Sequence, residues 1–300
     1  MSKDKSLTSD DLNQEVWNLF DDYVHSRINR RQFLNRVSRA GVAGVSATTI
    51  LTFLSPRYAE AQQVAPDDPR LSTDKVEYQS PKGAGRMRAL LAHPKNSKTK
   101  IPGIIVVHEN RGLNPHIEDV TRRAALEGFL TLGPDALTPL GGYPGTDDAG
   151  RELQSKRDRN EILEDFIAAF DYLKSHPLCN GKIGVVGFCF GGWVSHMMAA
   201  RIPQLKAAVP FYGGQAPLEE VKNIKAPLLV QFAEHDERVN AGWPTYEKAL
   251  IEHNKAYKAF TYPETQHGFH NDTTPRYNPE AAKLAWQRTV DFFKENLLSN

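Results

Sequence analysis

The sequence predicts an α/β fold in which a mostly parallel sheet is covered by helices on both faces. From about residue 75 to the C-terminus, apolar runs bounded by turn residues alternate with helical patterns. This alternation is typical of parallel sheets, because parallel strands need a crossover helix between them. Several of the runs are continuously apolar, as expected for strands that are buried on both faces.

The expected strands and helices are spread evenly along this part of the chain. Strands are predicted at residues 87–92, 103–107, 129–132, 183–186, 207–212, 228–233 and 257–262. Helical patterns begin at Asn114, cover residues 162–173 and 194–200, and return after Asn278. Asn114 is typical of a helix N-cap and precedes Pro115, which suits a first helical turn. The glycine-rich stretch 138–150 is expected to lack regular structure and forms either a surface excursion or a rim of the binding site.

Composition narrows the classes of function. The chain has 300 residues and is 40% hydrophobic, which excludes a disordered or fibrous protein. Its 37 basic and 36 acidic residues nearly cancel, so no overall field attracts nucleic acid, and we predict no nucleic-acid partner. Two cysteines are too few for a disulfide scaffold or a zinc ribbon, and no metal or cofactor is expected.

Residues 1–61 have the features of an export signal. Residues 26–57 carry six arginines and no acidic residue. The pair Arg30-Arg31 precedes an uncharged run at 40–54, and Ala59-Glu60-Ala61 then supplies an A-x-A cleavage pattern. Paired arginines followed by Phe33-Leu34 resemble the twin-arginine signal of bacteria, which is read by a machinery that exports folded proteins.

This resemblance implies that the precursor binds the twin-arginine export machinery and that the mature protein is periplasmic or secreted. Cleavage after Ala61 would leave residues 62–300 as one α/β domain. The uncharged run is shorter than the roughly 20 apolar residues of a membrane span, so no stable membrane anchor is expected. The alternative is a retained amphipathic arm, because apolar residues recur there at helical spacing, at Val16, Leu19, Phe20 and Tyr23.

The most informative motif is Gly187-Phe188-Cys189-Phe190-Gly191, which follows a buried strand and precedes a helical pattern. Glycines on either side of a nucleophile allow a sharp strand-to-helix turn without collisions between neighbouring side chains. The positive end of the following helix favours a thiolate at Cys189. We therefore predict Cys189 as a nucleophile in the position that serine usually occupies.

An acid and a base follow in the order that α/β hydrolases use. Asp236 closes the strand at 228–233, and His267 follows the strand at 257–262. His267 is expected to take the thiol proton, and Asp236 to fix its tautomer. His270 is a less favoured base, because His267 directly precedes a glycine in the turn. Glu234 and Glu237 flank Asp236 and are expected to be solvated.

A second motif strengthens this interpretation. Val106 to His116 reads Val-Val-His-Glu-Asn-Arg-Gly-Leu-Asn-Pro-His and follows a buried strand. Together with Pro134-Asp135, the Gly-Phe-Cys-Phe-Gly-Gly turn and His-Gly-Phe at residues 267–269, it resembles the dienelactone hydrolase family of the α/β-hydrolase fold. The resemblance extends from about Lys75 to the C-terminus. It implies a Cys-His-Asp triad, a thioester intermediate and a small ester or lactone substrate.

The resemblance also assigns roles to three residues beside the triad. It implies that Glu109 lies beside the resting thiol and exchanges partners with it when substrate binds. The oxyanion donors would be the backbone N–H groups of Phe190 and Asn110. Members that act on a carboxylated lactone have an arginine at the position of Asn271, and Arg276 or Arg111 could substitute for it.

Two further classes of function stay open on the sequence. One is a non-catalytic hydrolase-fold protein that binds a ligand, and the other is a peroxide-reactive thiol protein. The intact set of nucleophile, acid and base disfavours the first, and the lack of an evident resolving cysteine disfavours the second. Cys179 is expected to be a loop thiol without a role in the reaction, and a disulfide between Cys179 and Cys189 is not expected.

Overall fold

A computed structural model describes residues 7–40 and 44–298 and contains one eight-stranded sheet. The strands are β1 (Leu71–Ser80), β2 (Gly85–Pro94), β3 (Ile101–Val107), β4 (Leu130–Pro134), β5 (Cys179–Phe188), β6 (Ala207–Phe211), β7 (Leu228–His235) and β8 (Tyr257–Gln266). Their order is β1-β2-β4-β3-β5-β6-β7-β8, and every pair from β4 to β8 is parallel. The predicted mixed α/β fold is confirmed.

All seven expected strands are present, and β1 is an eighth that the sequence analysis missed. It pairs antiparallel with β2 at the edge of the sheet, and most of its residues are at least partly exposed. The signal for strands was a continuous apolar run, and an exposed edge strand lacks such a run. Its polar, half-exposed pattern is typical of an edge that is covered on one face only.

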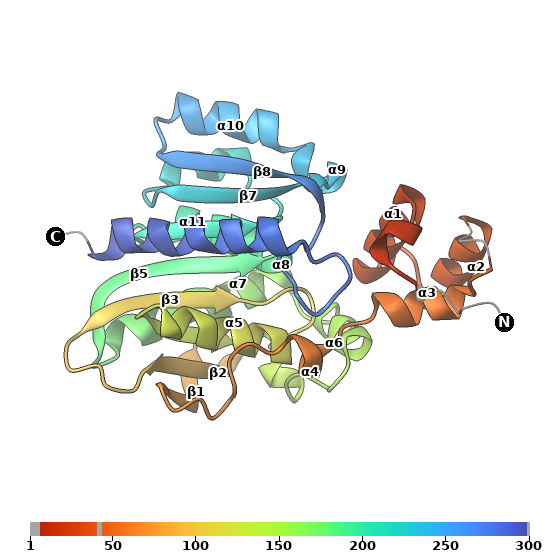
Figure 1. Cartoon of the computed structure of the whole chain (residues 1–300). Helices are drawn as coiled ribbons and strands as arrows, with labels where there is room; N and C mark the ends of the chain where they lie inside the picture. Colours follow the sequence, from red (N-terminus) through yellow and green to blue (C-terminus); the bar gives the residue numbers. More distant parts are fainter. Residues whose placement is uncertain (1–6, 41–43, 299–300) are drawn as a thin grey trace.

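Helices cover both faces of the sheet (Figure 1). The longer ones in this part are α5 (Pro115–Leu126), α7 (Arg159–Ser175), α8 (Phe190–Arg201), α10 (Trp243–Glu252) and α11 (Pro279–Leu298). Two clusters of buried side chains result, one beneath α7, α8 and α10 and the other beneath α5 and α11. Successive residues of β3 alternate between them: Ile104 and Val106 join the second cluster, Ile105 and Val107 the first.

Side-chain caps mark the start of two helices, α5 and the shorter α6, and α6 begins in a stretch that was expected to lack regular structure. Asn114 accepts a hydrogen bond from the Ile117 N–H, as an N-cap should. The stretch 138–150 was expected to lack regular structure, but it contains a 3₁₀ turn (Thr138–Leu140) and the start of α6 (Asp147–Gln154). The Thr146 side chain caps α6, so a capping signal was present in the sequence.

The N-terminal part forms a separate helical layer. It contains a 3₁₀ turn (Ser9–Asp11), α1 (Gln14–Val24), α2 (Arg30–Ala40), α3 (Ala47–Leu54) and α4 (Tyr58–Ala61). Helices α1 to α3 share an apolar cluster of their own, which includes the residues that recurred at helical spacing. In Figure 1 these helices lie beyond the end of the sheet toward which β3 and β5 point.

The structure does not test export or cleavage, which stay predictions. Part of the predicted apolar stretch of the signal, residues 41–43, lies outside the described residues. Among the described residues, no helix is long and apolar enough to cross a membrane.

Candidate active site

Cys189 lies in a strained turn between β5 and α8. Its backbone has φ 57° and ψ −110°, a conformation that residues with a side chain rarely adopt. The neighbouring glycines permit the close packing of this turn. A Cβ on Gly187 would lie 2.0 Å from the carbonyl oxygen of Gly191, and a Cβ on Gly191 would lie 2.4 Å from that of Val107. The geometry of the turn matches the one expected for a nucleophile.

The structure brings Cys189, His267 and Asp236 together at the carboxyl ends of the parallel strands. His267 Nδ1 lies 2.6 Å from Asp236 Oδ2, and both side chains are buried. The other ring nitrogen, Nε2, is buried without a hydrogen-bond partner among the described residues, and one nitrogen of the ring lies within 4.8 Å of the Cys189 sulfur. Tyr212 packs edge-on against the His267 ring, with centroids 5.1 Å apart. The imidazole is therefore fixed in orientation from two sides.

Electrostatics favour a thiolate and an imidazolium at this site. Burial alone would raise the pKa of Cys189, but the positive charges of His267 and of His25 lower it to about 5. Burial alone would lower the pKa of His267, but Asp236 and the thiolate raise it to about 10. Between these two values, Cys189 and His267 form an ion pair.

Glu109 is buried just after the end of β3, where it contacts Asn271 and Arg111. Its Oε2 accepts a hydrogen bond from Asn271 Nδ2 at 3.2 Å and lies 3.9 Å from Arg111 Nε. Burial would raise the pKa of Glu109, but Arg111 and other nearby positive charges hold it below its usual value. Among the described residues, no hydrogen bond joins Glu109 to Cys189. Its role as a partner of the thiol stays a prediction.

The two residues predicted to supply oxyanion donors, Phe190 and Asn110, line the same cavity as Cys189. Phe190 is the first residue of α8, where backbone N–H groups have no partner within the helix. Asn110 follows β3, and its side chain donates to the Val24 carbonyl oxygen at 2.7 Å. In the described part of the chain, neither backbone N–H donates a hydrogen bond to a protein acceptor. Both are therefore free to bind an oxyanion.

Three residues that the sequence offered for other roles lie elsewhere. His270 stacks on Phe188, and burial lowers its pKa to about 3. It is therefore neutral and poorly suited to act as the base. Arg111 binds Asp147, and Arg276 lies over the ring of Phe20 and near α1. Neither arginine lines the cavity that reaches the nucleophile.

That cavity, of about 720 Å³, opens from Cys189 between α8 and the N-terminal layer. The side chain of Trp193 lies on its wall, with the guanidinium of Arg159 stacked 3.6 Å from the ring centroid. Arg151, Arg157 and Arg238 also line it. The cavity therefore offers aromatic surface and positive charge, and the arginines come from segments that the sequence analysis did not single out.

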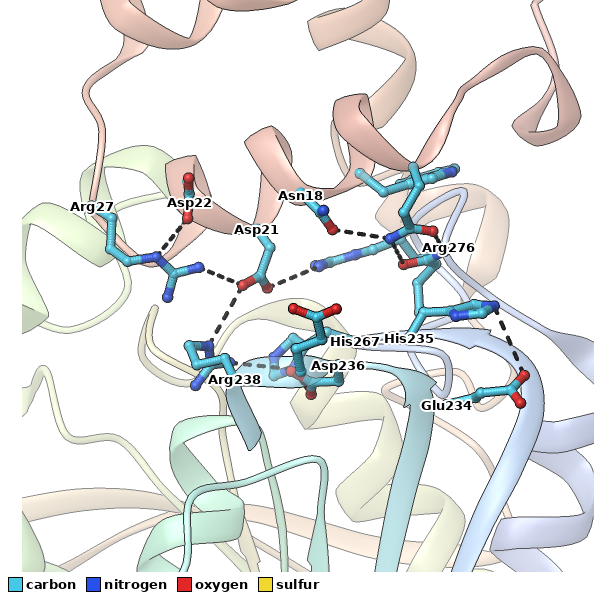
Figure 2. A pocket seen from close by; sticks show the side chains of 14 residues that line it. Asn18, Asp21, Asp22, Arg27, Glu234, His235, Asp236, Arg238, His267 and Arg276 are labelled. Carbon is cyan, nitrogen blue, oxygen red and sulfur yellow. Dashed lines mark hydrogen bonds and ion pairs between the residues drawn. The ribbon is translucent and has the colours of Figure 1, made fainter. Parts of the chain in front are cut away.

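The sequence analysis missed His25, which follows α1. Its Nε2 lies 3.3 Å from the sulfur of Cys189, and its ring meets His267 edge-on with centroids 4.9 Å apart. Figure 2 shows the adjoining pocket, where Asp21 of α1 lies between Arg27, Arg238 and Arg276. The spacing of Asp21 and His25 fits one helix face, but only the docking of α1 brings this pair to the nucleophile.

Three potential metal ligands meet at the same point. His25, Cys189 and His267 each offer one ligand atom, and these atoms lie within 4.8 Å of one another. However, Arg238 Nη2 lies 3.2 Å from His25 Nε2, so a cation there would face a guanidinium at close range. We assign no metal to this cluster.

The two cysteines are free thiols, and both are buried. Cys179 was expected to be a loop thiol, but it begins β5 and belongs to the apolar cluster beneath α7 and α8. Cys189 follows the last residue of the same strand, so the length of β5 separates the two thiols.

Comparisons with known proteins point to one family of hydrolases. A family model described as "Dienelactone hydrolase family" matches residues 87–297, and a second, "YqhI-like", matches residues 4–41. The chain is 31% identical over 247 residues to a "Putative carboxymethylenebutenolidase" of Saccharolobus solfataricus, covering 70% of this chain and 94% of the relative. It is also similar to the solved structure of a "Putative Dienelactone Hydrolase" from Klebsiella pneumoniae, with a TM-score of 0.66 and 30% identity, covering 75% of this chain and 99% of that one.

Proposed function

Because the chain belongs to the dienelactone hydrolase family and is a hydrolase, we propose that it cleaves a carboxylic ester or lactone with Cys189 as nucleophile. The observation that carries this proposal is the strained turn that holds the Cys189 thiolate beside the His267–Asp236 pair. The relatives named as carboxymethylenebutenolidases support a lactone as one form of substrate.

The reaction follows from the geometry in two halves. In the first, the thiolate attacks the carbonyl carbon, and the backbone N–H groups of Phe190 and Asn110 bind the developing oxyanion. The carbon–oxygen bond then breaks, and His267 gives its proton to the leaving oxygen. In the second, neutral His267 takes a proton from water, which attacks the thioester and releases the acid and the thiolate.

The cavity supports a substrate with a flat apolar part and a negative charge. Trp193 and Phe190 offer ring surface beside the nucleophile, and the exposed guanidinium of Arg159 lies over Trp193. Arginine can bind a carboxylate with two parallel hydrogen bonds, so Arg159, Arg151 and Arg238 are candidates to hold one. These arginines would take the place of the arginine that some family members have at the position of Asn271.

The test uses turnover of p-nitrophenyl acetate and of a panel of lactones with and without a carboxylate. We expect Cys189→Ala to abolish turnover, while Cys179→Ala retains it. Full activity of the Cys189→Ala variant would reject the mechanism. Turnover of no ester or lactone would favour a binding protein, and rapid oxidation of Cys189 by peroxide without hydrolysis would favour a thiol peroxidase.

Export is a separate proposal that rests on the sequence of residues 1–61. Arg30 and Arg31 are exposed at the start of α2, which leaves the pair accessible to an export receptor. We expect Arg30→Lys with Arg31→Lys to retain the protein inside a bacterial host, measured by cell fractionation. The mass of the exported protein then tests cleavage after Ala61. Export unaffected by the double substitution would reject the signal.

A further inference from the structure

The N-terminal layer reaches the nucleophile through one side chain. His25 follows α1 and is 14% exposed, on the wall of the cavity that opens from Cys189. Its Nδ1 lies 2.8 Å from the backbone oxygen of Asp21 and 3.1 Å from Asp21 Oδ1. Its Nε2 lies 3.3 Å from the Cys189 sulfur. This arrangement repeats that of His267, whose Nδ1 faces Asp236.

We propose that His25, oriented by Asp21, is a second catalytic imidazole that holds the Cys189 thiolate while residues 1–61 remain attached; cleavage after Ala61 would remove it. This inference rests on the proposed role of Cys189 and adds a group from outside the matched hydrolase region. His25 donates from Nε2 to the sulfur, and no covalent bond forms or breaks in this role. While His25 holds the sulfur, His267 remains available for proton transfer.

The docking of α1 is specific enough to place this residue. Asn110 Nδ2 donates to the Val24 carbonyl oxygen at 2.7 Å, which ties the end of α1 to the loop that carries an oxyanion donor. Tyr23 donates to Asp148 Oδ2 at 2.5 Å, and Arg151 lies over the Tyr23 ring. A polar and aromatic interface therefore joins α1 to the rim of the cavity.

The charges around the two imidazoles decide their protonation. Asp21 and Asp236 favour imidazolium ions, while Arg238 opposes them with Nη2 at 3.2 Å from His25 Nε2 and 3.4 Å from His267 Nδ1. Asp21 also lies 3.5 Å from Arg238 Nε and 3.9 Å from Arg276 Nη1. Arg27 also binds Asp21, with Nη2 2.6 Å from Oδ2, and Tyr212 packs against the ring of His267.

The balance of these effects favours a charged His25. Burial would lower the pKa of His25, but the Cys189 thiolate and the hydrogen bond with Asp21 raise it above its usual value. Burial would raise the pKa of Asp21, but the hydrogen bond from His25 and the neighbouring positive charges lower it far below its usual range. Asp21 is thus a permanent anion that orients His25, and it is a positioning residue.

The first experiment measures the thiol directly, independent of any ester. In the full chain carrying Cys179→Ser, alkylation of Cys189 by iodoacetamide is followed across pH. We expect a midpoint at about 5. His25→Gln should raise this midpoint by about one pH unit, because one of two neighbouring positive charges is lost. The matched control is His253→Gln, an exposed residue after α10, which should leave the midpoint unchanged.

A second measurement distinguishes a His25 that stabilises the thiolate from a His25 that obstructs access to it. With p-nitrophenyl acetate, His25→Gln should lower turnover about fivefold at pH 5 and little at pH 8, where the thiolate forms without help. Added imidazole should restore the alkylation midpoint of His25→Gly and should not affect His253→Gly. Asp21→Asn should move the midpoint in the same direction as His25→Gln.

Two results would overturn the inference. An alkylation midpoint that is the same with and without His25 would show that the imidazole does not act on the thiol. Higher turnover of His25→Gln at every pH would show that His25 obstructs the cavity. Either result leaves the Cys189→Ala test unaffected, so failure of this inference differs from failure of the proposed function.

Discussion

The two thiols of this protein lie at opposite ends of one strand and differ in chemistry. Cys179 begins β5 among apolar side chains, and burial raises its pKa above its usual value. Cys189 follows the end of β5, and the charges of two imidazoles lower its pKa to about 5 despite burial. Burial alone therefore disfavours the thiolate. At the carboxyl end of the strand, loops from several elements place charged groups that favour it.

Among the variants that test this difference between the two ends of β5, the largest loss of turnover is expected on removal of the proposed base, His267. His267→Gln should lower turnover by roughly 10²–10⁴-fold, since it removes both proton transfer and a charge that stabilises the thiolate. Steady-state kinetics with an activated ester measures this loss. His270→Gln should keep turnover within a few-fold, because His270 stacks on Phe188 and burial keeps it neutral. Equal losses in the two variants would contradict the assignment of the base.

The two thiols should also differ in alkylation. At pH 7 Cys189 is mostly thiolate, whereas the pKa of Cys179 lies above its ordinary value of 9.0 and leaves it almost entirely protonated. We expect iodoacetamide to modify Cys189 at least about 100-fold faster. Peptide mapping by mass spectrometry measures both rates in one sample. As pH falls through about 5, the alkylation rate of Cys189 should itself begin to fall, since its thiolate becomes protonated, while Cys179 stays the slower of the two thiols.

A smaller effect is expected from the turn that carries Cys189. Gly191→Ala places a Cβ where the carbonyl oxygen of Val107 lies 2.4 Å away, so β3 and α8 must separate. We expect a loss of about 1–3 kcal/mol in the free energy of unfolding and a slower alkylation of Cys189. Gly214→Ala is a matched control, because a Cβ there meets no atom within 4 Å. Equal stability of the two variants would show that the turn tolerates a side chain.

The smallest effect belongs to Cys179. Cys179→Ala leaves a small void in the apolar cluster, and we expect a loss of about 1 kcal/mol in the free energy of unfolding with unchanged turnover. Urea denaturation together with ester kinetics measures both. A large loss of activity would show that Cys179 acts on the site from the far end of β5.

The parts of the molecule that the sequence predicted are those with local signals. Buried parallel strands have continuous apolar runs, and the glycines on either side of Cys189 are a local signal for a sharp strand-to-helix turn. Asp236 and His267 could be placed because each follows a strand, and the ends of parallel strands converge. The edge strand β1 could not, because its half-exposed pattern lacks an apolar run. Helix α6 was missed because it begins within a glycine-rich stretch, although Thr146 there is a typical N-cap residue.

The features that were missed depend on packing between distant segments. His25 and Asp21 have no local mark of function, and only the docking of α1 brings His25 to Cys189. The cavity arginines come from α6, the turn between α6 and α7, α7 itself and α9 (Glu237–Asn240), and they converge through the fold. Asn271, where the family resemblance implies an arginine in some members, instead donates a hydrogen bond to Glu109 Oε2.

The covalent intermediate tests the central claim most directly. The full chain is mixed with an activated ester, quenched with acid within the first turnover, and digested for mass spectrometry. The account predicts the acyl group on the peptide that contains Cys189, none on the peptide of Cys179, and loss of the adduct in Cys189→Ala. Hydrolysis that proceeds without any acyl adduct on Cys189, or with the acyl group on another residue, would contradict it.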